Sequence, residues 1–106
     1  MIFSKGDILI VPFPFSNLYS VKKRPVVVLS EVGEDIIVCA ITSNLRENKY
    51  SVLIDNSCLS EGKLPTKSLI KIGKLFTINK KIVIKKVGIL NKNYFKKIRK
   101  EFLNLI

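Results

Sequence analysis

The sequence contains no histidine and no tryptophan, and only two cysteines occur among its 106 residues. A chain without histidine can form neither a Ser-His-Asp triad nor a nuclease site built on paired imidazoles. Two irregularly placed cysteines predict no disulfide framework, and alone they make a poor zinc site. The sequence also lacks a Walker-type glycine loop, a G-x-G-x-x-G motif and an HExxH motif. We therefore expect no metal ion and no other cofactor.

Long apolar runs are absent as well. No run approaches the roughly 20 residues that cross a bilayer. The first residues, MIFSKGDILIVPFPF, lack the basic-then-apolar order and the small-residue cleavage site of a signal peptide. We therefore expect a cytoplasmic location and no membrane partner. Cys39, inside the short apolar run IIVCAI, is expected to be a buried thiol that behaves as a small hydrophobic side chain.

Acidic residues are scarce. Eight Asp and Glu stand against 19 Lys and Arg, which gives a formal net charge of +11, and residues 63–106 hold 13 of the cations but one acid. This asymmetry predicts a basic face whose natural counterpart is RNA, DNA or an acidic protein. The alternative is a lysine-rich composition that binds nothing anionic, since 16 of the 19 cations are lysine.

Short β-branched runs separated by turn residues predict a mostly-β fold, with residues 1–106 forming a single domain. Strands are expected at residues 7–13, 25–30, 35–42, 50–55, 68–72 and 82–90, and a short strand or 3₁₀ turn at 74–78. The intervening segments 16–24 and 56–67 are predicted to be long loops. A small barrel is favoured over an open sheet because closure removes exposed edges.

The last 16 residues, NKNYFKKIRKEFLNLI, change to a helical period. One face of this predicted helix carries Phe95, Ile98, Phe102 and Leu105 and is expected to pack on the sheet. Its other face is mostly basic. Either Asn91 or Asn93 is expected to be the N-cap.

The stretch KKRPVVVLS places Lys22, Lys23 and Arg24 directly before a proline and an apolar strand. Because like charges repel, the three cations of this cluster either stay in solvent or face a negatively charged partner. Pro25 restricts Arg24 to extended backbone and so fixes it at the start of the strand.

Five motifs occur in a characteristic order: GDILIV at residues 6–11, KKRPVVVLS at 22–30, AITS at 40–43, KSLIKIGKLFTINKK at 67–81, and VGIL at 87–90 before the helix. In this order the chain resembles the PemK/MazF family of toxin endoribonucleases. The resemblance implies an SH3-like small barrel of about six to seven strands with a C-terminal α-helix. It also implies a homodimer that cleaves single-stranded mRNA without a metal and is neutralised by an antitoxin. The basic C-terminal half indicates that this antitoxin is acidic.

The resemblance also implies site residues. The arginine of the R-P motif and the threonine of the I-T-S motif line the family's cleavage site, and they match Arg24 and Thr42. Ser43 and Lys71 are the expected accessory residues. The expected RNA-binding residues are Lys22, Lys23, Lys74 and Asn17.

Two positions depart from the family pattern. Gly73 stands where some members have a catalytic acidic residue, and Phe76 stands where many have arginine. The alternative function is therefore a non-catalytic RNA- or protein-binding module of the same barrel. A gyrase-poisoning toxin is ranked last, because those proteins resemble one another in a Trp-Gly-Ile ending and this chain ends Asn-Leu-Ile.

Overall fold

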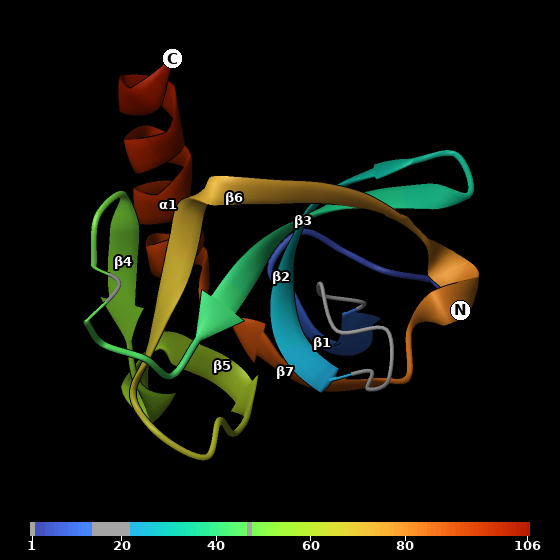
Figure 1. Cartoon of the computed structure of the whole chain (residues 1–106), viewed down its shortest axis with the longest axis horizontal. Helices are drawn as coiled ribbons and strands as arrows, with labels where there is room; N and C mark the ends of the chain where they lie inside the picture. The colour runs from blue at the N-terminus through green and yellow to red at the C-terminus, as the bar shows by residue number, and fades with distance from the viewer. Residues whose placement is uncertain (1, 14–21, 47) are drawn as a thin grey trace.

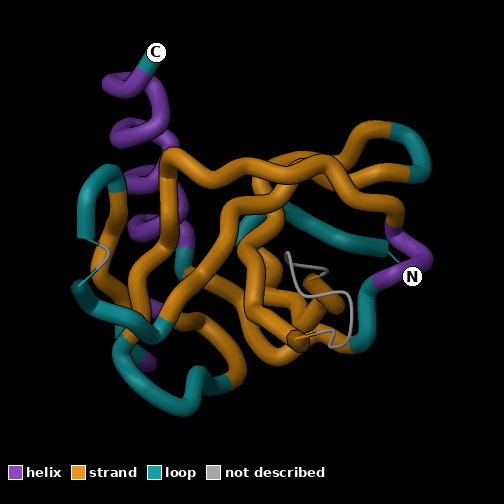
Figure 2. The backbone as a smooth tube through the Cα atoms, in the orientation of Figure 1, coloured by secondary structure: helices purple, strands orange, loops and turns teal. Residues whose placement is uncertain are grey.

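A computed structural model describes residues 2–13, 22–46 and 48–106 of the chain. Seven strands form one sheet, and a helix follows them (Figures 1 and 2). The elements in chain order are β1 (Asp7–Phe13), β2 (Lys22–Val32), β3 (Asp35–Thr42), β4 (Ser51–Ile54), β5 (Leu59–Gly62), β6 (Ser68–Asn79), β7 (Lys85–Leu90) and α1 (Lys92–Leu105), with 3₁₀ turns at Asn56–Cys58 and Lys80–Ile82.

The strand order in the sheet is β4-β6-β3-β2-β1-β7-β5, and the neighbouring strands are antiparallel. Strands β1, β2 and β3 form a central meander. Strand β6 extends it beside β3, and β7 extends it beside β1. The sheet curls into a half-barrel (Figure 1). The predicted mostly-β fold with a C-terminal helix is therefore confirmed.

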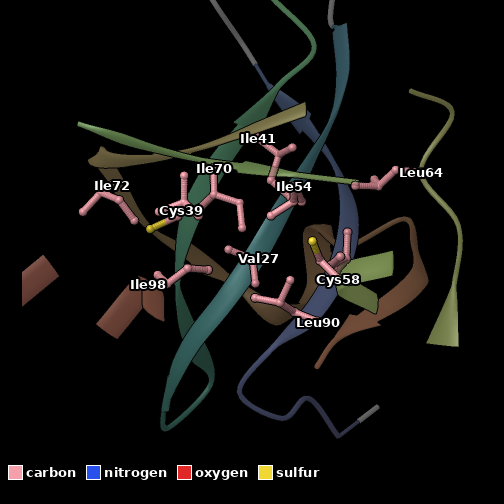
Figure 3. Close-up of a cluster of buried hydrophobic side chains, with 12 residues drawn as sticks. Val27, Cys39, Ile41, Ile54, Cys58, Leu64, Ile70, Ile72, Leu90 and Ile98 are labelled. Atoms are coloured by element: carbon pink, nitrogen blue, oxygen red, sulfur yellow. The ribbon is translucent and has the colours of Figure 1, made fainter. Parts of the chain in front are cut away.

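Successive side chains of a strand point to opposite faces of the sheet, and both faces hold buried apolar residues. One face, called here the helix face, packs against Ile98 of α1 and is shown in Figure 3. Its central residues are Ile8, Val27, Cys39, Ile41 and Ile70. The other, called here the opposite face, carries Leu9, Val11, Val26, Val28, Ile36, Val38 and Ala40. The predicted buried thiol of Cys39 is confirmed, since the residue is 1% exposed.

The Gly-Asp dipeptide at the start of β1 has a structural explanation. Gly6 has a positive φ of 92° and bonds through its backbone to Val28 and Leu90. Asp7 is buried, and its carboxylate accepts a hydrogen bond from the backbone N–H of Ser4 at 2.9 Å and forms an ion pair with Lys86 at 3.2 Å. The motif therefore joins β1 to β2 and β7.

Several predicted boundaries are wrong. Strand β2 begins at Lys22, so residues 22–24 belong to a strand and not to the predicted loop 16–24, of which residues 16–21 lie outside the described part. Strand β5 lies inside the predicted loop 56–67. It forms because Leu59 pairs with the distant Leu90, a contact that the local sequence does not signal.

The second half of the sheet differs from the prediction as well. Strand β6 runs unbroken from Ser68 to Asn79, so the predicted separate element at 74–78 is part of it. Strand β7 begins at Lys85, because residues 80–82 form a 3₁₀ turn capped by Asn79, whose side chain accepts a hydrogen bond from the backbone of Lys81.

Helix α1 follows β7 directly. Of the two predicted N-caps Asn91 is confirmed, since its side-chain oxygen accepts a hydrogen bond from the backbone N–H of Tyr94 at 2.9 Å. Ile98 is buried and Phe95 and Phe102 are half-buried, but Leu105 is 41% exposed. The last turns of the helix extend past the sheet, which explains the exposure of Leu105 (Figure 1).

Candidate RNA-binding face

Arg24 and Thr42 lie beyond the same end of the β2–β3 pairing. Val26 of β2 pairs with Ala40 of β3, and the pairing of the two strands ends there. Arg24 and Thr42 each lie two residues beyond this last pair, so by alternation they share the face of Val26 and Ala40. Residues that oppose each other in an antiparallel pair project from the same face. Both side chains therefore lie on the opposite face, at one end of the sheet.

Lys71 lies on the next strand and on the same face. Thr42 pairs with Leu69 of β6, and Lys71 is two residues further along that strand, across from Ser51 of β4. The three candidates Arg24, Thr42 and Lys71 thus come from the neighbouring strands β2, β3 and β6. These positions, far apart in the sequence, share one face of three adjacent strands, and we call this group the basic face.

All three side chains are held by the fold. Thr42 is 9% exposed and Lys71 is 8% exposed, while Arg24 is half-buried with its Nε atom shielded from solvent. A buried lysine and a shielded guanidinium lose part of their hydration, so an anion that reaches them competes with less water. The arrangement favours binding of a phosphate.

The hydroxyl oxygen of Thr42 is bonded to the loop that follows β3. Its oxygen accepts a hydrogen bond from the backbone N–H of Asn44 at 3.1 Å. A hydroxyl has one proton to donate, and this contact occupies a lone pair and leaves that proton available. Thr42 is therefore suited to donate a hydrogen bond to a ligand oxygen.

Sequence reasoning missed the loop between β3 and β4 as a support for the basic face. Asn44 bonds to Thr42 and also accepts a hydrogen bond from the backbone N–H of Arg46 at 3.2 Å. The Lys71 ammonium donates to the carbonyl of Lys49 at 3.4 Å. The asparagine in the Ser-Asn pair after Thr42 could have indicated this loop. In turns, an asparagine side chain commonly accepts a hydrogen bond from the backbone N–H two residues further on.

The other described candidates are exposed and do not all share the face of this group. Lys22 and Lys23 are exposed on β2, and alternation puts Lys22 on the face of Arg24 and Lys23 on the helix face. Ser43 and Lys74 are exposed as well. Asn17 lies outside the described residues.

The two positions that depart from the family pattern have different surroundings. Phe76 is half-buried and packs with the core of the opposite face. Gly73 is exposed on β6, and a Cβ atom built there would meet Tyr50 Cβ at 3.7 Å, which is ordinary contact. Phe76 therefore contributes to packing, whereas Gly73 leaves room for a side chain.

Acidic and thiol groups do not form a metal-binding cluster in the described part of the chain. The pKa of Asp55 is lowered by hydrogen bonds from the side chain and backbone of Ser57, which cap a 3₁₀ turn. The pKa of Glu31 is lowered by its contact with Lys80. Both carboxylates are engaged in local contacts.

A comparison with protein families matches residues 4–106 to the PemK-like, MazF-like toxins of type II toxin-antitoxin systems. The chain belongs to this family. No curated protein matches this chain. Within its described residues, it has no helix long and apolar enough to cross a membrane.

Proposed function

We propose that this PemK-like toxin is a cytoplasmic, single-domain endoribonuclease that cleaves single-stranded mRNA without a metal. The observation that carries the proposal is the convergence of Arg24, Thr42 and Lys71 on one face of three adjacent strands. In the family resemblance, the first two line the cleavage site and the third assists. RNA is the polyanion that carries the 2′-hydroxyl needed for cleavage without a metal.

Metal-independent cleavage proceeds by in-line attack of the neighbouring 2′-hydroxyl on phosphorus. The bond from phosphorus to the 5′-oxygen breaks, which leaves a 2′,3′-cyclic phosphate and a 5′-hydroxyl. Negative charge accumulates on the non-bridging oxygens during the attack. Groups that stabilise this charge in place lower the barrier.

Each residue of the basic face has a role suited to its chemistry. The guanidinium of Arg24 binds two phosphate oxygens at once and stays charged at any working pH. Thr42 donates its free proton to a phosphate oxygen or holds the 2′-hydroxyl. Lys71 adds a positive charge beside them. None of these roles is proton abstraction, because a guanidinium and an ammonium have no lone pair to accept a proton and a hydroxyl is not basic enough for it.

The exposed cations around this group guide the RNA strand. Lys22, Lys23 and Lys74 supply attraction to phosphates that is independent of sequence and falls with salt. Ser43 assists Thr42, and Asn17 contributes from the segment before β2. The affinity for RNA therefore decreases as the salt concentration rises.

The protein partners follow from the family and the charge. A type II toxin has an antitoxin partner. We propose that this antitoxin is acidic, since the toxin carries a net charge of +11, and that the toxin is a homodimer. Sedimentation of the purified protein tests the dimer. A salt-dependent interaction with the product of the adjacent gene tests the acidic partner.

The test of cleavage is incubation with a mixed-sequence single-stranded RNA in excess EDTA. The expected result is cleavage with cyclic-phosphate ends by the native protein, with loss of activity in Arg24→Ala and Thr42→Ala. Matched controls are Arg99→Ala on α1 and Thr77→Ala on β6, which remove the same groups elsewhere and should leave cleavage intact. Equal activity in Arg24→Ala and the native protein would contradict the proposal.

The second candidate is a non-catalytic RNA- or protein-binding module of the same fold. It is favoured by the apolar packing of Phe76 and by the missing side chain at Gly73. Binding of RNA without cleavage, in a folded protein that still depends on Arg24, is the outcome that selects this candidate.

A further inference from the structure

A groove of about 690 Å³ lies between α1 and the part of the helix face that α1 leaves uncovered. Its floor is apolar. Leu29 of β2, Ile37 of β3 and Leu75 of β6 line it from the sheet, and Phe95 and Phe102 line it from the helix. Leu29 and Ile37 are half-buried, and Leu75 is 37% exposed. The size of the groove and its apolar lining are typical of sites for small molecules.

The floor offers little hydrogen bonding to a ligand. Among the described residues of the lining, Ser30 is the only polar side chain that the sheet contributes. Its hydroxyl donates to the backbone carbonyl of Glu31 at 3.4 Å. Polar ligand groups would lose water on this floor without a replacement, whereas an alkyl chain has no polar group to satisfy and gains free energy from its burial. The floor therefore suits an alkyl chain.

The polar part of the groove is positively charged. Lys5, Lys92, Lys96 and Arg99 line it, and its described lining includes no acidic residue. All four cations are exposed. The three on α1 follow one another at spacings of four and three residues, so they form one row along the helix beside the apolar floor. This row favours a ligand with an anionic group.

Two of these cations mark one end of the groove, where β1 and β7 meet. Lys5 comes directly before Gly6, whose backbone carbonyl accepts a hydrogen bond from the backbone N–H of Leu90 at 2.8 Å. Lys92 follows Leu90 by two residues and begins α1. Two separate segments of the chain thus supply a cation to the same end, and this end suits the anionic head of a ligand.

The other end of the groove is apolar. It is marked by Leu75 on β6 and Phe102 on α1, and α1 lies beside β6 (Figure 1). In the sheet β6 is three strand spacings from β1, which is about 14 Å. Phe102 is about 15 Å along the helix axis from Lys92. A ligand that reaches from the cationic end to the apolar end is therefore elongated as well as amphipathic.

We propose that this groove binds a free long-chain fatty acid. Its carboxylate, ionised at neutral pH, lies at Lys5 and Lys92, and its alkyl chain lies along the floor toward Leu75. The inference does not rest on the proposed function. The groove lies on the helix face, whereas Arg24 and Thr42 lie on the opposite face of the same sheet, so the two sites are tested separately.

Other occupants fit this groove less well. RNA would bring ribose and phosphate groups that lose water against an aliphatic floor without a polar partner. A second copy of this chain would bring the same four cations into the contact and be repelled.

The first test varies the ligand. Isothermal titration calorimetry of the purified full chain with dodecanoate, below its micelle-forming concentration, is expected to show one molecule bound per chain. Octanoate has the same head and a shorter tail, and we expect it to bind at least tenfold more weakly because fewer methylenes are buried. Dodecyltrimethylammonium has the same tail and a cationic head, and we expect at least a tenfold loss with it. Equal binding of the two dodecyl compounds overturns the inference.

The second test varies the cationic end. The double variant Lys5→Glu, Lys92→Glu reverses both charges and is expected to weaken dodecanoate binding at least tenfold. Its matched control is Lys81→Glu, Lys85→Glu, which makes the same charge change at exposed positions outside the groove lining. The control is expected to change the affinity less than threefold. Equal weakening by the two variants shows that total charge drives binding, and it overturns the inference.

The third test varies the apolar end. Leu75→Gln is expected to weaken dodecanoate binding about tenfold and to affect octanoate less, because the shorter tail ends before Leu75. Leu103→Gln on α1, which is 58% exposed and outside the groove lining, is its control and is expected to bind like the native chain. Circular dichroism and thermal melting show that each variant is folded. An equal loss for both fatty acids in Leu75→Gln contradicts the proposed direction of the tail.

Three further outcomes overturn the inference. The native chain then fails to bind dodecanoate, or it binds phosphatidylglycerol vesicles and not the free fatty acid, which assigns the groove to a membrane surface. In the third, the dodecanoate affinity falls as the protein concentration rises, which assigns the groove to a contact with a second copy. Loss of RNA cleavage in a chain that still binds dodecanoate rejects the proposed function alone.

Discussion

The backbone N–H of Asn44 donates a hydrogen bond to the hydroxyl oxygen of Thr42 at 3.1 Å. This contact ties the end of β3 to the loop that follows it. It occupies one lone pair of the hydroxyl oxygen, and the hydroxyl keeps its own proton as a donor.

Thr42→Val keeps the shape of the side chain and removes the hydroxyl. We expect cleavage to slow by roughly 10²-fold, because loss of one oriented donor to a developing oxyanion has about this effect. Thr42→Ser should retain most of the activity, since serine can make both hydrogen bonds. Single-turnover cleavage rates measure the difference. A Val variant as active as the native protein beside a slow Ser variant would show that packing of the methyl group matters, and not the hydroxyl.

Arg24→Lys preserves the charge and removes the planar fork. We expect at least a tenfold loss of cleavage rate in Arg24→Lys and roughly a 10²- to 10³-fold loss in Arg24→Ala. Circular dichroism and thermal melting are needed beside the rates, because Arg24 is half-buried. A lysine variant as active as the native protein contradicts a bidentate contact.

Gly73→Asp introduces a carboxylate where some family members have one. The position is exposed and has room for a Cβ atom, so the variant should fold normally. A carboxylate near Lys71 can take part in proton transfer, and we expect cleavage to accelerate roughly ten- to a hundredfold. Gly73→Asn is the isosteric control and should give no gain. A rate that is unchanged in both variants would mean that position 73 lies outside the reach of the substrate.

Gly62→Ala is expected to destabilise the fold strongly. Gly62 has a φ of 80°, and a Cβ atom there would lie 2.0 Å from the carbonyl oxygen of Val87, so β5 would have to separate from β7. Gly33 provides the matched control, because its φ of 61° is also positive but its Cβ would meet nothing within 4 Å. We expect a loss of about 1 kcal/mol for Gly33→Ala and several times more for Gly62→Ala. Urea unfolding compares the two.

Cys39 makes stability depend on pH in the alkaline range. Burial raises the pKa of its thiol to about 12, whereas an unfolded chain has a thiol pKa of about 8.5. Between these values the unfolded state binds fewer protons than the native state, so the free energy of unfolding falls as pH rises. The stability linked to the neutral thiol is fully present below about pH 8.5 and is lost progressively toward pH 12.

The measurement compares the native protein with Cys39→Ala. At neutral pH the alanine variant is less stable, because it loses buried volume. At pH 10 the native protein has lost about 2 kcal/mol relative to neutral pH through this thiol, and the alanine variant has not. The gap between the two therefore narrows with rising pH. A constant gap would indicate that the thiol ionises equally in both states.

Much of the fold could be predicted from the sequence where the pattern is local. Strands β1 and β3 have the predicted bounds, because their apolar runs are bordered by turn residues. Strand β5 was missed since its short polar sequence forms a strand only by pairing with β7. The continuity of β6 through Gly73 was also missed, because a glycine in an apolar run is read as an interruption.

The candidate site also combines features that the sequence predicts with features that it does not. Arg24, Thr42 and Lys71 were named from the family resemblance, and the register explains why these three positions go together. The contacts of Asn44 and Lys49 could not be predicted, because they depend on how the loop after β3 folds back. The groove beside α1 could not be predicted either, since its lining comes from five separate elements and the N-terminal segment.

The order of the strands also has a kinetic consequence. Strands β1, β2 and β3 pair through consecutive hairpins, so the face that Arg24 and Thr42 share forms through contacts that are close in sequence. Lys71 arrives only when β6 pairs with β3, and β7 must then return to β1, where Asp7 pairs with Ile89. Such distant pairings form slowly, because loop-closure entropy is lost before the contacts are gained. We therefore expect the meander to pair before β6 joins β3, so that the basic face is completed late in folding.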